Sequence, residues 1–262
     1  MAPLRFAVIG DPIAHSKSPR MHGAALAALG LPHTYEAVRV TAADLPAIVE
    51  ALRRGELAGL NVTVPHKRRV LALVDEVAPS ARAAGAANTL ARAEGGRVVA
   101  HNTDVPALVE ELRLLGGSDV TWSARRGLVL GSGGAARAAV AALERLGARD
   151  VVIRARGLPG WAPSAASEAQ AGAIVQATSA GMTGADPGDG VAAVVAWASL
   201  PPTCVALDVV YAPPETPFLR AARARGLRAE NGLGLLARQG ALALQLWLGV
   251  EAPLEVMRAA LG

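Results

Sequence analysis

Two lysines stand out in this 262-residue chain, because they are the only lysines among its 26 lysine and arginine residues. Lys67 ends the segment Asn61-Val62-Thr63-Val64-Pro65-His66-Lys67, and Lys17 lies within His15-Ser16-Lys17-Ser18-Pro19. Arginine can supply a solvated positive charge, but it stays protonated and cannot exchange a proton near neutral pH. The remaining lysines are therefore candidates for acid–base chemistry, although codon bias explains their small number equally well.

Lys67 and Asp104 form the candidate reaction centre. Asp104 closes a second polar segment, Asn102-Thr103-Asp104. A lysine near a carboxylate can pass a proton to or from a substrate hydroxyl, and positioned acid–base groups contribute a factor of about 10² to 10⁴ in rate. The alternative is an ordinary ion pair at a domain junction. Lys17 suggests no chemistry of its own, and we expect its side chain to be solvated.

Ser16 and Ser18 lie where a helix is expected to begin. Hydroxyl groups and free backbone amides at a helix start can hold a carboxylate or a phosphate. Ser18 followed by Pro19 also fits simple capping of the helix. His15 and His66 lack the paired spacing of a metal site, so we interpret them as local hydrogen-bonding groups and expect no metal.

A glycine-rich segment follows an expected strand at 127–130 and opens an expected helix at 135–146. Its residues are Gly131, Ser132, Gly133, Gly134 and Ala135. Glycines at such a place allow a tight turn and a close approach of the backbone to a pyrophosphate at the helix N-terminus. The pattern favours dinucleotide binding over a tight turn without a ligand.

The residues after the next expected strand, at 151–153, bear on which dinucleotide is bound. An NAD site places Asp or Glu there for the ribose hydroxyls, whereas an NADP site places Arg near the 2′-phosphate. This chain has Arg154 and Arg156 and no acid between them. The sequence therefore favours NADP, with solvated surface arginines as the alternative.

Alternation of short aliphatic runs with Ala/Leu-rich stretches predicts an α/β protein with mainly parallel sheets. We expect two domains with a boundary near Asp104, and a hairpin turn at 93–96. The expected strands are 4–9, 33–40, 60–64, 88–92, 97–101, 127–130, 151–153, 173–176 and 205–209, and the main expected helices are 18–29, 43–53, 105–115 and 135–146.

Composition narrows the class of protein. The net charge is only +4 and aromatic residues make up 3% of the chain, so nucleic-acid binding through stacked bases is not expected. The single cysteine, Cys204, excludes an intrachain disulfide and is expected to be buried. No signal peptide or membrane span is recognisable, so we expect a soluble cytoplasmic protein.

Several polar motifs in the same order make the chain resemble the NADP-dependent shikimate dehydrogenase family. They are residues 13–19, 61–67, 84–89 and 102–104, the glycine-rich segment, residues 177–182, and residues 232–235 leading to Gln239. The resemblance implies reversible NADPH-dependent reduction of 3-dehydroshikimate to shikimate in aromatic amino-acid biosynthesis. It also implies two α/β domains with a cleft between them: a discontinuous shikimate-binding domain, 1–103 and 237–262, and a Rossmann-like NADP-binding domain, 104–236.

The resemblance also implies roles for particular residues. Lys67 and Asp104 would handle the proton of the C3 hydroxyl. Carboxylate contacts would come from Ser16, Ser18 and Tyr211, ring-hydroxyl contacts from Asn61, Thr63, Asn88, Asp104 and Gln239, and cofactor contacts from the glycine-rich segment, Arg154, Arg156, Thr178, Val209 and Gly232. A homodimer is possible.

The chain departs from the family pattern after the second nucleotide strand. The family usually has Asn-Arg-Thr there, and this chain has Ala155-Arg156-Gly157, followed by an expected loop at 158–163 in place of a longer helix. After Asp104 the family usually has glycine, and here Val105 and Pro106 follow. Two alternatives remain open: a quinate/shikimate dehydrogenase that uses NAD, and a protein that senses NADP or shikimate without turnover.

Overall fold

The computed structural model describes residues 2–262 and divides the chain into two compact units. The first unit comprises Met1–Asp104 and Leu236–Gly262, and the second comprises Val105–Leu235. The first unit is thus built from two separate stretches of the chain. The division falls at the start of helix α4 (Asp104–Gly116) and near the start of helix α9 (Leu233–Leu248).

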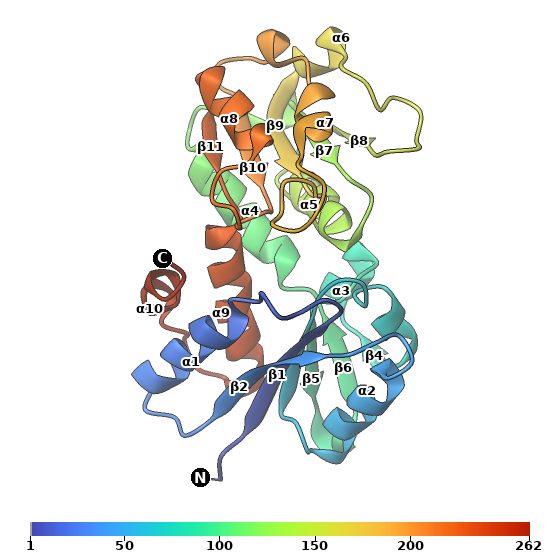
Figure 1. Ribbon diagram of the computed structural model, residues 1–262, viewed down its shortest axis with the longest axis vertical. Helices are drawn as coiled ribbons and strands as arrows, with labels where there is room; N and C mark the ends of the chain where they lie inside the picture. The colour runs from blue at the N-terminus through green and yellow to red at the C-terminus, as the bar shows by residue number, and fades with distance from the viewer. Residues whose placement is uncertain (1) are drawn as a thin grey trace. The chain divides into compact units, whose positions relative to one another are not determined.

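A six-stranded sheet forms the centre of the first unit (Figure 1). Its strand order is β2-β1-β3-β5-β6-β4, and β5 runs antiparallel to both of its neighbours while the other pairs are parallel. The link between β5 and β6 is a short turn, Glu94–Gly96, which confirms the expected hairpin. The strands are β1 (Arg5–Gly10), β2 (Thr34–Arg39), β3 (Gly59–Val62), β4 (Glu76–Val77), β5 (Thr89–Arg92) and β6 (Val98–His101).

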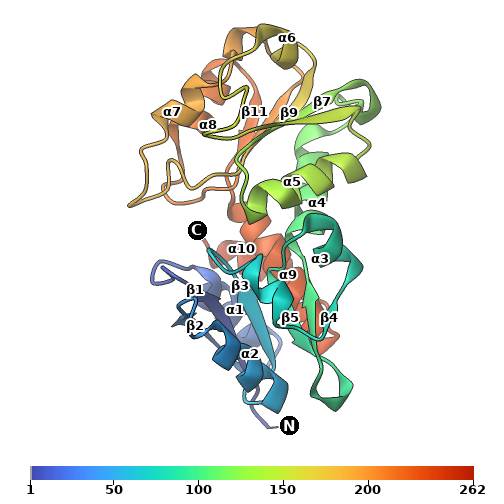
Figure 2. The ribbon, with the colours of Figure 1, turned by 90° about the vertical axis from the view of Figure 1, so that its right-hand side faces the viewer.

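Side-chain alternation along the strands gives this sheet two apolar faces, each covered by helices (Figure 2). On one face, Ala7 and Ile9 of β1 pack in a cluster with residues of α2 (Leu45–Arg54) and α3 (Pro79–Ala84). On the other, the Phe6 ring stacks on Trp247 of α9 with ring centroids 5.0 Å apart. Helices α1 (Ser18–Ala28) and α10 (Leu254–Ala259) pack against each other within the same unit.

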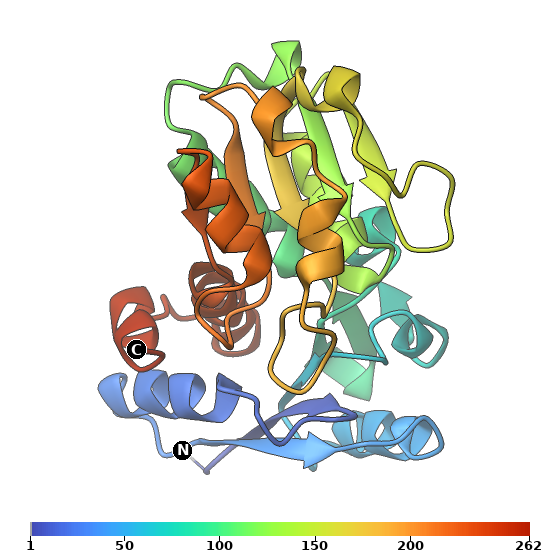
Figure 3. The same ribbon diagram turned by 45° about the horizontal axis from the view of Figure 1, so that its top comes forward.

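The second unit contains a five-stranded sheet in which every pair of neighbours is parallel (Figure 3). The strand order, β11-β10-β9-β7-β8, reverses direction at β7, because β8 and β9 lie on its two sides. The strands are β7 (Arg126–Leu130), β8 (Asp150–Arg154), β9 (Ala171–Gln176), β10 (Val205–Asp208) and β11 (Arg228–Glu230), and the helices are most of α4 with α5 (Gly134–Arg145), α6 (Ala165–Glu168), α7 (Asp189–Ala193) and α8 (Pro217–Ala224).

Strand β7 is buried on both faces, as a central parallel strand must be. Leu128 and Leu130 pack in one cluster with Phe218 of α8. On the opposite face Gly127 lies against Leu143 of α5, so closely that a Cβ atom at this glycine would be 2.7 Å from the leucine side chain. Cys204 is buried in the unit's core, as expected.

The α/β fold expected from the sequence is confirmed in both units. Among the described residues 2–262, no helix combines the length and the apolar character needed to cross a membrane. Short 3-10 helices complete the elements, at Arg69–Ala72, Trp122–Ala124 and Trp197–Ser199.

Candidate active site

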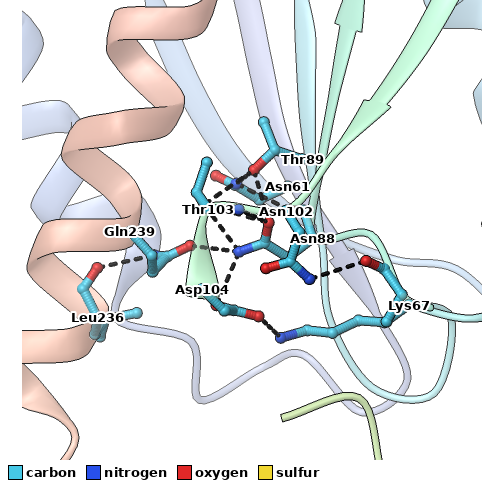
Figure 4. A network of polar contacts seen from close by, with 10 residues as sticks. Asn61, Lys67, Asn88, Thr89, Asn102, Thr103, Asp104, Leu236 and Gln239 are labelled. Atoms are coloured by element: carbon cyan, nitrogen blue, oxygen red, sulfur yellow. Dashed lines mark hydrogen bonds and ion pairs between the residues drawn. The ribbon is translucent and has the colours of Figure 1, made fainter. Parts of the chain in front are cut away.

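The first unit brings Lys67 and Asp104 into direct contact. Lys67 follows β3 through a short turn, and Asp104 is the first residue of α4. Lys67 Nζ donates a hydrogen bond to Asp104 Oδ2 at 2.7 Å, and the two side chains are 17% and 10% exposed (Figure 4). An ammonium held by a carboxylate, with both groups still reachable from solvent, can exchange a proton with a substrate hydroxyl.

Asn88 lies at the centre of the polar cluster in Figure 4 and links Asp104 to its neighbours. Its amide Nδ2 donates to Asp104 Oδ1 at 2.8 Å, to Thr103 Oγ1 at 2.9 Å and to Gln239 Oε1 at 3.3 Å. Its Oδ1 accepts the backbone N–H of Thr103 at 2.8 Å. These bonds hold Asp104 from a second side, so that its carboxylate is oriented independently of Lys67.

The segment containing Asn88 is tied directly to the backbone of Lys67, because Ala87 N donates to Lys67 O at 2.7 Å. Gln239 comes from α9, in the C-terminal part of the first unit, and its Nε2 donates to Leu236 O at 2.8 Å. The fold therefore brings together four candidate residues from separate segments of the chain: Lys67 and Asn88 contact Asp104, and Gln239 contacts Asn88.

Asn61 lies on β3, which pairs with β5, and both the oxygen and the nitrogen of its side-chain amide form hydrogen bonds. Its Nδ2 donates to Asn88 O at 3.2 Å and to Thr89 Oγ1 at 3.1 Å, while its Oδ1 accepts the hydroxyl of Tyr35 at 2.7 Å. Thr63, two residues along, is anchored by its backbone N–H to Ile9 O at 2.9 Å.

Tyr35 was not recognised from the sequence, although it touches two of the candidate binding residues. Its ring stacks on the buried His22 ring with centroids 4.0 Å apart and planes at 5°. Burial raises the pKa of the Tyr35 hydroxyl well above its ordinary value, and a hydrogen bond with the Ser18 side chain lowers it. Burial also lowers the pKa of His22 to about 3, so the stacked partner is a neutral imidazole at neutral pH.

Helix α1 begins differently from the sequence expectation. Ser18 is the first helical residue, and the N-cap residue before it is Lys17, whose side chain makes no capping hydrogen bond. The capping interpretation of Ser18 is therefore wrong. The Ser16 hydroxyl instead accepts the backbone N–H of Ser18 at 3.3 Å, so both serine side chains lie at the helix start.

Lys17 has a definite partner, contrary to the expectation of a solvated side chain. Its Nζ donates to Leu261 O at 2.8 Å, and Arg20 reaches Gly262 O at 3.4 Å. Lys17 thus ties the residues that follow α10 to the start of α1, beside the two serines.

The glycine-rich segment of the second unit fits a dinucleotide pyrophosphate. It leaves β7 where the strand order reverses, and it enters α5 at Gly134. Gly131 has φ +128°, and a Cβ there would be 2.8 Å from Ala177 O, whereas a Cβ on Gly133 would meet nothing within 4 Å. The first glycine is therefore required by close packing, and the second leaves open space in front of the free N–H groups of the helix.

Arg154 does not lie where its sequence position suggested. Its side chain is 3% exposed and forms two hydrogen bonds with the fully buried Glu168, Nη1–Oε1 at 2.7 Å and Nη2–Oε2 at 2.8 Å. A third bond runs from Nη1 to Val194 O at 2.9 Å. Its guanidinium is thus engaged inside the second unit and is not available to a 2′-phosphate.

Arg156 remains the candidate for the 2′-phosphate. Its side chain is 70% exposed and pairs with Asp186, Nη2–Oδ2 at 3.0 Å. The backbone carbonyl of Arg154 accepts the N–H of Gly131 at 2.7 Å, which places this part of the chain directly beside the glycine-rich segment. The region after Arg156 contains no helix until the four-residue α6, as expected.

The remaining cofactor candidates lie at the carboxyl ends of neighbouring parallel strands. Thr178 follows β9, where its hydroxyl donates to Gln176 Oε1 at 2.8 Å. Val209 follows β10, and a Cβ on Gly232 would be only 2.2 Å from the Val209 carbonyl oxygen, so that position accepts glycine alone. Tyr211 lies two residues beyond Val209, in the second unit.

Asp208 is a buried acid in this region that the sequence did not indicate. It accepts three hydrogen bonds, from Thr216 Oγ1 at 2.6 Å, Val210 N at 2.9 Å and Gln176 Nε2 at 3.2 Å. Burial raises the pKa of its carboxyl from 3.8 to about 6, despite the lowering effect of the bonds from Thr216 and Val210. Asp208 therefore connects the ends of β9 and β10 at the cost of an unfavourable buried charge.

We expect Asp208→Asn to remove a pH dependence of stability. A raised pKa in the folded state stabilises the protein fully below the unfolded pKa, and this contribution is lost as the pH rises through about 6. A pKa shift of one unit corresponds to 1.36 kcal/mol, so the free energy of unfolding should decrease by about 3 kcal/mol. Asparagine can still accept from Val210 N and can donate to Thr216, so the free energy of unfolding of wild type relative to the variant should fall between about pH 4 and pH 7. Urea denaturation of both proteins across this range measures it, and a difference independent of pH would contradict the assignment.

Comparisons with known proteins agree with this arrangement. The family model described as the shikimate dehydrogenase substrate binding domain matches residues 8–90, and that of the shikimate 5′-dehydrogenase C-terminal domain matches residues 232–261. The shikimate dehydrogenase (NADP(+)) of Symbiobacterium thermophilum is 38% identical over 97% of this chain and 92% of its own length.

Solved structures show the same similarity along the whole chain. The shikimate 5-dehydrogenase of Thermus thermophilus, in complex with NADP(H) and shikimate, is 37% identical with a TM-score of 0.84 and 98% of each chain covered. The 5-ketofructose reductase of a Gluconobacter strain is 29% identical with a TM-score of 0.84, covering 100% of this chain and 98% of its own. By its identity to curated relatives along nearly its full length, this chain belongs to the shikimate dehydrogenase family.

Proposed function

We propose that this protein is an NADP-dependent shikimate dehydrogenase, which reversibly reduces 3-dehydroshikimate to shikimate in the pathway to aromatic amino acids. The observation that carries the proposal is the 2.7 Å pair of Lys67 Nζ and Asp104 Oδ2, set among amide groups. A polyhydroxylated ring needs several neutral donors and acceptors for its hydroxyls and one group able to exchange a proton. The cluster around Asn88 supplies both.

When bound in the second unit, the reduced cofactor NADPH would supply a hydride to C3, and the oxidised form NADP+ would accept it in the reverse direction. In the direction of reduction, the carbonyl oxygen at C3 gains the proton that converts it to a hydroxyl. The Lys67 ammonium can donate to this oxygen and deliver the proton, while the Asp104 carboxylate accepts from Lys67 and is kept in place by Asn88. In the direction of oxidation, the same pair removes the proton from the hydroxyl.

The other binding residues are assigned by the resemblance of their motifs to those of the family. We assign the shikimate carboxylate to Ser16, Ser18 and Tyr211, because hydroxyl groups can donate to an anion. Ring hydroxyls are assigned to Asn61, Thr63, Asn88 and Gln239. For NADP, we assign the pyrophosphate to Gly131, Ser132, Gly133, Gly134 and Ala135, the 2′-phosphate to Arg156, and the nicotinamide side to Thr178, Val209 and Gly232.

NAD use is the second candidate function, and the structure provides a reason to test it. Only Arg156 of the two expected arginines is exposed, and it is already paired with Asp186. The positive charge available to a 2′-phosphate is therefore smaller than the sequence indicated. A sensor that binds without turnover is disfavoured, because binding alone has no need of the Lys67–Asp104 pair.

Steady-state kinetics of the purified protein test the proposal. We expect the highest kcat/KM for shikimate with NADP when shikimate and quinate are each combined with NADP and NAD. Reduction of 5-ketofructose with NADPH should be measured in parallel, because a 5-ketofructose reductase shares this fold. Absence of NADP reduction with shikimate across the tested pH range would reject the proposed activity.

Tyr35→Phe is expected to weaken substrate binding while leaving turnover nearly unchanged. The substitution keeps the ring on His22 but removes the hydroxyl that Asn61 Oδ1 accepts at 2.7 Å, so the Asn61 amide loses its fixed orientation. A hydrogen bond of this kind is worth about 1 kcal/mol, which corresponds to a KM for shikimate about fivefold higher. Initial-rate kinetics separate the two parameters. A fall in kcat with KM unchanged would instead place Tyr35 in the chemical step.

The expected cytoplasmic location and homodimer remain predictions. Sedimentation equilibrium of the purified chain measures its oligomeric state directly.

A further inference from the structure

The pair formed by Arg156 and Asp186 joins two loops that leave the sheet on opposite sides of β7. Arg156 follows β8, and Asp186 lies in the loop after β9. Strand β7 pairs with β8 on one side and with β9 on the other, and the glycine-rich segment starts at its carboxyl end. The ion pair therefore connects the two loops that flank the glycine-rich segment.

The Asp186 carboxylate is held in one orientation by its own loop. Its Oδ1 accepts the N–H of Gly188 at 2.9 Å, and its backbone carbonyl accepts the N–H of Gly181 at 2.7 Å. Oδ2 is left to accept from Arg156. The bond from Gly188, followed by that from Arg156, lowers the pKa of Asp186, so it is an anion at neutral pH.

A fixed anion beside Arg156 affects the two nicotinamide cofactors in opposite ways. A 2′-phosphate carries nearly two negative charges at neutral pH, so it must share Arg156 with the carboxylate and is repelled by it. A free 2′-hydroxyl is a hydrogen-bond donor, and a carboxylate at the end of the second nucleotide strand is the acceptor that NAD sites use. In this chain that acceptor would come from the loop after the third strand of the sheet.

We propose that Asp186 is a specificity-determining residue of the cofactor site, which lowers affinity for NADP by holding Arg156 and raises affinity for NAD by accepting from the ribose 2′-hydroxyl. The inference rests on the proposed function, because it requires the second unit to bind a nicotinamide dinucleotide. Arg154 cannot compensate, since Glu168 holds its guanidinium in the interior.

Isothermal titration calorimetry of the full chain with NADP, NAD, 2′,5′-ADP and 5′-AMP tests the proposal without turnover. Asp186→Asn keeps an acceptor for Gly188 N, so the loop should retain its conformation. We expect NADP and 2′,5′-ADP to bind about two- to fivefold more tightly, the range of an exposed ion pair, and NAD to bind about fivefold more weakly through the lost charged acceptor. Arg156→Gln should weaken 2′,5′-ADP binding and leave NAD binding nearly unchanged.

Asp189→Asn is the matched control, because Asp189 is an exposed acid of the same segment and its loss changes the net charge equally. Equal effects of Asp189→Asn and Asp186→Asn on the ratio of the NADP and NAD dissociation constants would overturn the inference. An unchanged ratio in Asp186→Asn would also overturn it while leaving the proposed function intact. Failure of the wild type to bind either dinucleotide would instead reject the proposed function.

Discussion

Replacement of Lys67 by methionine is expected to lower kcat for shikimate oxidation by a factor of about 10² to 10⁴. Methionine keeps most of the length and the apolar stem of lysine but cannot hold or exchange a proton. Asp104 keeps its bond from Asn88, so the carboxylate should stay in place. The dissociation constant of shikimate should change by less than about tenfold, because the loss corresponds to about one hydrogen bond at the ring.

Two further variants separate proton transfer from charge. Lys67→Arg retains a cation that can pair with Asp104, yet arginine cannot release its proton near neutral pH. We therefore expect its kcat to be nearly as low as that of Lys67→Met. Arg68→Met removes an exposed positive charge at the next position and should leave kcat within about twofold of wild type, as is usual for an exposed site away from the reacting groups. Near wild-type turnover in Lys67→Arg would show that charge alone suffices.

The proximity of Lys67 to Asp104 could be expected from the sequence because each of the two residues belongs to a short polar motif. Asp104 begins α4, Asn88 immediately precedes β5, and Lys67 lies in the turn between β3 and the 3-10 helix at Arg69–Ala72. Backbone geometry at such places is constrained, so a motif there predicts its own surroundings well. The contacts among them then follow from the sheet, which brings β3 beside β5.

Tyr35 could not be predicted in the same way, since its partner depends on strand order. Tyr35 lies on β2 and Asn61 on β3, and β1 runs between the two strands. In the register of the sheet, Phe6 of β1 is opposite Tyr35 and Val8 of β1 is opposite Asn61. A tyrosine is long enough to reach across one strand, but nothing local to the segment around Tyr35 indicates where its hydroxyl ends.

Lys17 and Arg154 show the limit of counting charges along a sequence. Both were expected to be exposed or to face a ligand, and both have partners outside their own segment, Leu261 for one and Glu168 for the other. A charged residue at the end of a strand or helix can turn outward or inward with little change in local backbone. Only the position of the partner group, a backbone carbonyl for Lys17 and a carboxylate for Arg154, decides between the two.

Arg154→Met should destabilise the second unit by about 3 to 5 kcal/mol, because it leaves the Glu168 carboxylate buried without its counter-charge. Burial alone raises the pKa of Glu168, and the hydrogen bonds from Arg154, Ala196 N and Ser164 N together lower it below its ordinary value. Without Arg154 the balance shifts towards the protonated acid. The variant should therefore recover part of its lost stability as the pH is lowered, which urea denaturation at several pH values measures.

Combining Arg154→Met with Glu168→Gln distinguishes an internal ion pair from a cofactor contact. A glutamine at 168 carries no charge, and its carbonyl oxygen can still accept from Ala196 N, which lies 2.9 Å from Glu168 Oε1. Most of the lost stability should therefore return in the double variant, since replacing both members of a buried pair is far less costly than removing one. If Arg154 serves only the interior, the stabilised double variant should bind NADP within about twofold of wild type, as additivity of separate sites requires. A large loss of NADP affinity in this well-folded protein would return Arg154 to the 2′-phosphate site, and the buried geometry would then have to open on binding.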